Sequence, residues 1–160
     1  MNKIASFLFG LVTGIVCKGM VEHKIIDLMK LESQENKDKK KFRSYYYMLN
    51  KWIEIGQSGR KIEDLFLEKN YYNIAIYGMG ETGTRLYYEL MNTKVKVKFV
   101  IDQQLKGKIT GFPVMDDKDS FEEIDAIIVS IPFAYEEVKK NMSGKTTKPV
   151  VSLEHILFEV

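Results

Sequence analysis

The sequence predicts an α/β fold: a small four-stranded parallel sheet with helices on both faces, preceded by N-terminal α-helices. The first observation behind this prediction is a set of short apolar runs, of which the second alternates before it becomes apolar and the others are typical of strands buried on both faces of a parallel sheet. They occupy residues 73–77, 95–101, 125–131 and 149–153. The second is that helical patterns follow the first and the third run, as parallel connections require. Right-handed crossovers predict the strand order 3-2-1-4.

Composition and charge limit the class of protein. The chain has 160 residues, 45% hydrophobic and 29% charged, which allows one domain with its own core plus an appendage and excludes a disordered or collagen-like chain. Residues 1–50 contain nine Lys and Arg against five Asp and Glu, and the basic residues are densest at 37–43. This run indicates a solvated helix face, or a patch for anionic lipid or a nucleic-acid backbone. Because no aromatic-interleaved RNA-binding signature accompanies it, we expect no nucleic-acid partner.

Cysteine and histidine usage argues against disulfides and metal sites. Cys17 is the single cysteine, so no disulfide can form within the chain, which agrees with a reducing cytoplasm. The two histidines, His23 and His155, have no partner cysteine pattern. We therefore expect neither a zinc site nor a Cys–His dyad.

An uncharged, mostly apolar run at residues 4–17 lies between Lys3 and Lys18. It is shorter than the about 20 residues that a spanning helix needs. Its Gly10-x-x-x-Gly14 spacing lets two helix backbones approach closely. Three interpretations stay open: a helix for self-association or for a partner protein, an anchor at a membrane surface, or a cleaved signal. We expect a cytoplasmic protein, with membrane association through residues 4–17 as the open question.

The rest of the N-terminal region is expected to be helical. Apolar periodicity carries the first helix to about Leu31, and the polar residues 32–41 form a solvated helix turn or a break. An amphipathic helix follows and ends at the glycines of residues 56–59. Its apolar stripe comprises Phe42, Tyr45, Tyr46, Leu49, Trp52 and Ile53. We therefore divide the chain into a helical region, 1–59, and an α/β domain, 60–160, which opens with a short helix at 62–69.

A glycine motif follows the first strand. Gly78-Met79-Gly80-Glu81-Thr82-Gly83 has G-x-G-x-x-G spacing and is followed by a helix, a second strand and Asp102. This order of strand, glycines, helix, strand and acid is typical of a Rossmann-like nucleotide-binding fold. Gly78 allows the tight turn, Gly80 lets a phosphate approach the backbone, and Gly83 lets the helix pack against the sheet. The helix N-terminus attracts an anion, and Asp102 is placed to accept a ribose hydroxyl.

Further candidate ligand contacts lie at the same edge of the predicted sheet. Met79, Glu81 and Thr82 complete the loop, and the charge of Glu81 favours a smaller or differently posed ligand over NAD. Lys106 follows the second strand and could reach a phosphate. Ser130 to Pro132 form the carboxyl end of the third strand, on the side where open α/β sheets bind ligands.

Four stretches together carry a family resemblance: IAIYGMGETGTRLYYEL (74–90), VID (100–102), KGKITGFPV (106–114) and DAIIVSIP (125–132). They resemble a Rossmann-like domain of bacterial surface-polysaccharide and modified-sugar pathways. The domain is similar to the N-terminal, nucleotide-sugar-binding half of sugar O/N-acyltransferases and to the C-terminal domain of sugar C-methyltransferases. The resemblance covers about residues 60–158 and implies ligand contacts at Gly78, Gly80, Gly83 and Asp102. It implies no reaction, since the sequence shows neither hexapeptide repeats nor a second Rossmann domain.

Three functional hypotheses follow. The first is an accessory protein of polysaccharide biosynthesis that binds a nucleotide or a UDP-type nucleotide sugar and forms homo-oligomers or meets a partner through its N-terminal helices. The second is an NAD(P)-binding oxidoreductase or redox sensor, suggested by Tyr135-x-x-x-Lys139. The third is a non-catalytic oligomerisation module with a vestigial pocket. We name no catalytic residue and expect that the chain is not a complete enzyme by itself.

Overall fold

The computed structural model describes residues 3–108, 111–115 and 120–159, with side chains described from residue 23 onward. The chain divides into two compact units, Met1–Phe42 and Arg43–Val160, which we describe separately. The sequence placed the boundary at residues 59 and 60. The structure instead assigns residues 43–59 to the same unit as the sheet.

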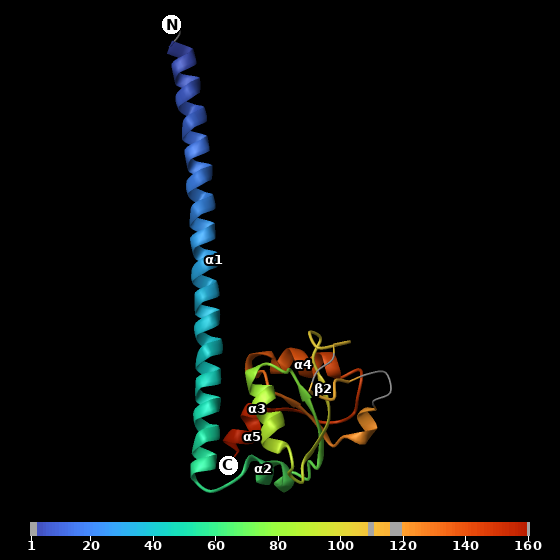
Figure 1. Cartoon of the computed structure of the whole chain (residues 1–160). Coiled ribbons are helices and arrows are strands. Elements are labelled where there is room, and N and C mark those ends of the chain that lie inside the picture. Colours follow the sequence, from blue (N-terminus) through green and yellow to red (C-terminus); the bar gives the residue numbers. More distant parts are fainter. Residues whose placement is uncertain (1–2, 109–110, 116–119, 160) are drawn as a thin grey trace. The chain divides into compact units, whose positions relative to one another are not determined.

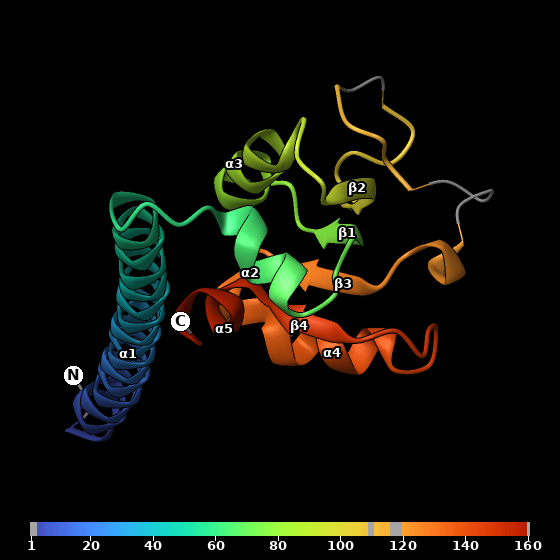
Figure 2. The same ribbon diagram turned by 90° about the horizontal axis from the view of Figure 1, so that it is seen from below.

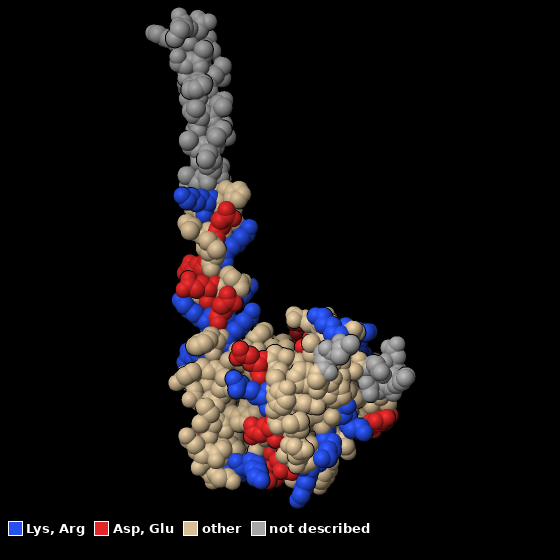
Figure 3. Space-filling view, viewed as in Figure 1, with Lys and Arg blue, Asp and Glu red and all other residues tan. Residues whose placement is uncertain are grey.

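Helix α1 (Lys3–Gln57) includes the whole polar stretch 32–41, which is therefore helical and not a break. Exposed ion pairs one turn apart support it, among them Lys39 with Glu35 at 2.7 Å. Basic and acidic side chains are mixed along the part of α1 whose side chains are described (Figure 3). The expectations for residues 4–17 concern side chains outside those described. Within residues 23–108, 111–115 and 120–159, every helix is too short or too polar to cross a membrane.

The C-terminal turns of α1 belong to the core of the second unit. Met48, Trp52 and Ile55 are buried there, and Tyr45 and Leu49 pack against them half-buried. The predicted position of the apolar stripe was therefore wrong, because the buried face of α1 lies part of a turn away from it. Its members Phe42, Tyr46 and Ile53 are 74%, 56% and 58% exposed. The reason is that apolar residues occur on two faces of this helix, so spacing alone does not identify the face that meets the sheet.

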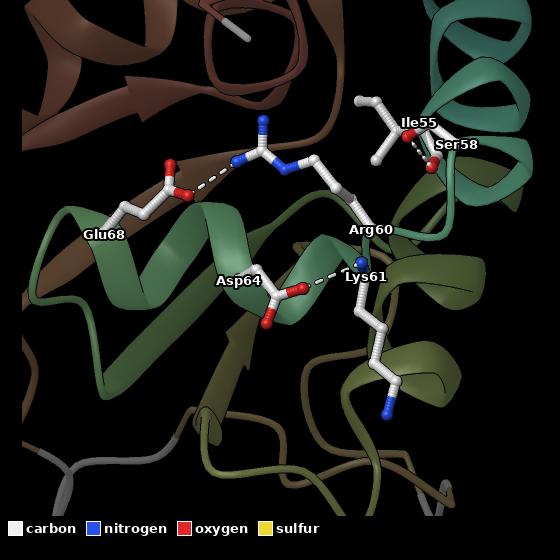
Figure 4. Close-up of polar contacts among 6 residues, drawn as sticks. All are labelled: Ile55, Ser58, Arg60, Lys61, Asp64 and Glu68. Carbon is white, nitrogen blue, oxygen red and sulfur yellow. Dashed lines mark hydrogen bonds and ion pairs between the residues drawn. The ribbon is translucent and has the colours of Figure 1, made fainter.

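A short, well-bonded turn connects α1 to α2 (Ile62–Glu68). The Ser58 hydroxyl donates to the carbonyl of Ile55 at 2.6 Å, and Gly59 adopts a positive φ of 83°. The backbone N–H of Lys61 donates to the Asp64 carboxylate at 2.9 Å, which satisfies a donor at the start of α2 (Figure 4). These bonds fix where α1 ends, as the glycines at 56–59 predicted.

The sheet has four strands, all parallel: β1 (Asn73–Tyr77), β2 (Lys96–Ile101), β3 (Ala126–Val129) and β4 (Val150–Ser152). Helices α3 (Glu81–Leu90), α4 (Tyr135–Met142) and α5 (Leu153–Phe158) follow β1, β3 and β4 (Figure 1). The predicted α/β class, the parallel sheet and the N-terminal helices are thus confirmed.

The predicted strand order was wrong, because the sheet runs β2-β1-β3-β4 instead of 3-2-1-4. The outer edge of β2, where a third strand would sit in the predicted order, is occupied by the following loop. There the N–H of Val100 donates to Pro113 O at 2.8 Å, and the N–H of Met115 donates to Val100 O at 2.9 Å. With that edge taken, β3 pairs with the free side of β1.

Helices cover both faces of the sheet, as predicted (Figure 2). One face packs against α2, α3, α5 and the end of α1, with Ile74 and Ile76 of β1 at its centre. The other packs against α4 and the 3₁₀ turn Phe121–Glu123, with Ala75 of β1 and Phe99 of β2 inside. Side chains that alternate along β1 therefore serve two cores, which explains its continuous apolar sequence.

Trp52 links α1 to α3 through a hydrogen bond to Glu89, a carboxyl group whose burial makes stability depend on pH. Its indole N–H donates to the Glu89 carboxylate at 2.8 Å. Burial raises the pKa of Glu89 above its ordinary 4.5, while the Trp52 hydrogen bond acts in the opposite direction. The folded state therefore holds the proton more tightly, so stability is lost as pH rises above that ordinary value.

We expect the melting temperature of Glu89→Gln, which keeps an acceptor oxygen and removes the charge, to rise relative to that of the wild type between about pH 4 and about pH 7. Thermal melts of both proteins across this range test the prediction. A melting difference that does not change with pH would contradict it.

Candidate functional site

The candidate site lies where the chain reverses its direction across the sheet. From β1 the chain moves outward to β2, then returns to the other side of β1 to form β3. Tyr77 pairs with Ile101 of β2 and with Val129 of β3, so the three carboxyl ends are level. Open α/β sheets bind ligands in the crevice at such a switch point. The glycine loop, Asp102 and Ser130 all follow directly from these strand ends.

Two glycines of the motif are required by close packing. Gly78 has a positive φ of 89°, and a Cβ on it would lie 2.5 Å from Ile131 Cδ1. At Gly83 a Cβ would overlap the carbonyl oxygen of Gly78 and lie 3.0 Å from Ser130 Oγ. Gly78 thus makes the turn off β1 and Gly83 lets α3 approach it, the structural roles expected from the sequence.

Gly80 differs from the other two glycines because it faces open space. It is exposed and caps α3, and nothing lies within 4 Å of a Cβ built on it. The first backbone bond of the helix runs from Thr84 N–H to Gly80 O at 2.9 Å. The N–H groups of residues 80–83 therefore precede the first helical hydrogen bond, and N–H groups at this position are the ones with which helices bind anions.

The three residues between the glycines have different environments. Glu81 is exposed in the first turn of α3, Thr82 is buried at 6% exposure, and Met79 is half-buried. Of these, Thr82 faces the protein interior and Glu81 faces solvent beside the helix N-terminus.

Asp102 connects the end of β2 to the glycine loop. One carboxylate oxygen accepts the N–H of Met79 at 2.8 Å, and the other accepts the N–H of Gln104 at 2.8 Å. The side chain thus fixes the loop and the turn after β2 at the same time. Each oxygen keeps a second lone pair, so a ligand hydroxyl could bind without displacing either bond.

Ser130 and Pro132 point into the protein. The Ser130 hydroxyl, 2% exposed, donates to Gly78 O at 2.6 Å, and Pro132 is buried at the start of a 3₁₀ turn. Ser130 therefore holds the loop in position from beneath. Its role as a ligand contact stays a prediction.

A pocket of ≈ 300 Å³ opens beside Asp102. Lys106, the lysine predicted to reach a phosphate, lines this pocket, and so does Lys145 from the turn after α4. The floor is apolar, formed by Met115, Phe121 and Met142 among others. Sequence reasoning missed Lys145 and the apolar floor. These residues follow no motif, and only the packing of α4 against β2 brings them to Asp102.

Tyr135 and Lys139 both make contacts within the fold. The Tyr135 hydroxyl donates to the carbonyl of Val150 at 3.2 Å, and Lys139 Nζ lies 5.5 Å from the centre of the tyrosine ring. The hydroxyl therefore connects α4 to β4, and the cation packs on the ring. Among the described residues, no group of His, Cys, Asp and Glu could hold a metal ion.

The fold and the site define an α/β domain with a glycine-rich loop at the switch point of a parallel sheet. Residues 70–147 match the family model described as C2185-like, N-terminal. This match runs from the residues before β1 through α4 and includes the glycine loop, Asp102 and Ser130. No curated protein and no solved structure matches the chain.

Proposed function

We propose that this protein binds a nucleotide or a nucleotide sugar at the switch point, as a cytoplasmic accessory protein of bacterial surface-polysaccharide biosynthesis. The observation that carries the proposal is the bond between Asp102 and the Met79 N–H, because it holds the ribose-binding acid against the phosphate loop. The resemblance to the nucleotide-sugar-binding domains of sugar-modifying enzymes supports a sugar nucleotide as the ligand.

The ligand can be positioned group by group. Its phosphate would meet the N–H groups at the start of α3 through the open space at Gly80. Its ribose would donate to Asp102, and its base or sugar would enter the neighbouring pocket, where Lys106 and Lys145 supply positive charge. Glu81 stands in the first turn of α3 and disfavours additional phosphate there.

A thermal-shift panel on the full chain tests the proposal. We would use UDP, UDP-sugars, CDP, NAD, NADP, coenzyme A and S-adenosylmethionine. A ligand at about 100 times its Kd should add roughly 2.7 kcal/mol, which raises Tm by several degrees. A shift with UDP or a UDP-sugar is expected. No shift with any compound would overturn nucleotide binding, and a shift with NADP alone would favour the dinucleotide alternative.

Gly80→Leu separates binding from folding. Gly80 has φ −66° and ψ −167°, which leucine also adopts, and its surroundings are open. The variant should fold like the wild type and lose the ligand-induced shift, because its side chain occupies the phosphate approach. Gly56→Leu, also in open space but on α1, is the matched control and should keep the shift. Unchanged binding in Gly80→Leu would rule out the phosphate-loop assignment.

A further inference from the structure

A groove in the second unit lies between the end of α1 and α3, with a volume of ≈ 590 Å³. Its apolar lining includes Leu49, Ile53 and Tyr88, of which Ile53 is 58% and Tyr88 55% exposed. Its charged lining is Glu81, Arg85 and Glu89. This groove shares Glu81 with the nucleotide site proposed above, and its other lining residues lie outside that site.

Exposed apolar side chains also occur on α1 within the first unit. Ile25 and Leu28 are 50% and 58% exposed, and every described residue from 23 to 40 is exposed. Helices in proteins gain most of their stability from packing an apolar face. These side chains therefore indicate that α1 packs against another molecule.

The spacing of residues along α1 describes the surface that would pack. Along one side of α1, nine residues follow each other at alternating intervals of three and four, the spacing of the contact positions of paired helices, and six of the nine are apolar. The positions are Ile25, Leu28, Glu32, Glu35, Lys39, Phe42, Tyr46, Leu49 and Ile53. We call this series the α1 seam. It is apolar at both ends and charged in the middle.

The charged middle of the α1 seam selects the orientation of a second copy. In a parallel pair, Glu32, Glu35 and Lys39 would each face the same residue of the other chain, and like charges in contact are destabilising. In an antiparallel pair centred on residue 37, Glu35 faces Lys39 of the second copy and Lys39 faces its Glu35. We propose that the chain forms an antiparallel homodimer through α1 in this register.

The same register joins the apolar ends. Ile25 of each copy meets Leu49 of the other at the groove, and Leu28 meets Tyr46. Charge agrees with this placement, since the groove carries two glutamates and one arginine, while residues 23–31 carry two lysines and one aspartate. The two-fold symmetry repeats each contact, so both grooves are filled by the first unit of the partner. Among these facing pairs of the α1 seam, only Glu32 with Phe42 places a charge against an aromatic ring.

The mass of the full chain in solution tests the pairing. Analytical ultracentrifugation should show a dimer at chain concentrations on the order of 10 µM. Ile25→Asp should weaken association roughly 100-fold, because a dimer contains this layer twice and each loses about tenfold. Ile26→Asp is the matched control: Ile26 is also 50% exposed but lies outside the seam. A monomeric wild type, or equal weakening by both variants, overturns the proposal.

A charge swap tests the orientation. Glu35→Lys alone places lysine against Lys39 in both central layers of the antiparallel dimer and should weaken association. Glu35→Lys combined with Lys39→Glu restores opposite charges and should recover it. In a parallel dimer, residues 35 and 39 would each face a like charge, whether the protein is the wild type, the single variant or the double variant. Equal association of the three proteins would therefore overturn the antiparallel register.

Discussion

Gly83→Ala is expected to destabilise the second unit by about 3 kcal/mol or more. An alanine Cβ would overlap the carbonyl oxygen of Gly78 and press on Ser130 Oγ. Neither neighbour can move easily, because Ser130 donates to that same carbonyl at 2.6 Å. The overlap must be relieved by moving α3 away from β1, which exposes Leu86 and Leu90. Urea unfolding followed by circular dichroism measures the loss.

Gly80→Ala provides the matched comparison within the same motif. No atom lies within 4 Å of its added Cβ, so stability should stay within about 0.5 kcal/mol of wild type. The two glycines thus differ in kind: one is needed for packing and the other leaves the approach to the loop open. If Gly83→Ala were as stable as Gly80→Ala, the close contact of α3 with the turn would be wrong.

Elements whose position is set by local chemistry could be predicted from the sequence. Strand β1 was predicted at 73–77 and spans Asn73–Tyr77, because an apolar run ends at a glycine that alone suits a φ of 89°. The short helix predicted at 62–69 was also confirmed, since α2 spans Ile62–Glu68 and buries Leu65 and Phe66. In each case the pattern and the terminating residue lie within a few positions of each other.

Features that depend on distant segments could not be predicted in the same way. The strand order turned on whether the loop around Pro113 would cover the edge of β2, and no local pattern decides that. The buried face of α1 depended on which apolar residues the sheet would meet. Met48 and Ile55 are buried in place of Phe42 and Ile53, although all four are suitable core residues.

The candidate site also combines features that local sequence predicts with features that depend on distant segments. Spacing alone identified the glycine loop and Asp102, because one supersecondary unit contains both. The bond from the Met79 N–H to Asp102 shows that the acid also organises the loop, a role that spacing does not reveal. Lys145 reaches the same pocket from the far end of α4, and only tertiary packing brings it there.

The end of α1 is expected to be as important to the domain as any strand, and Trp52→Ala tests this. Removing the ring should cost about 3–5 kcal/mol, because Trp52 is buried against the core and its indole N–H holds Glu89 at 2.8 Å. Glu54→Ala, two residues away on an exposed pair with Lys51, should stay within about 0.5 kcal/mol of wild type. Urea unfolding of each full-length variant gives the two values. A loss below about 1 kcal/mol in Trp52→Ala would contradict the burial of its ring in the core.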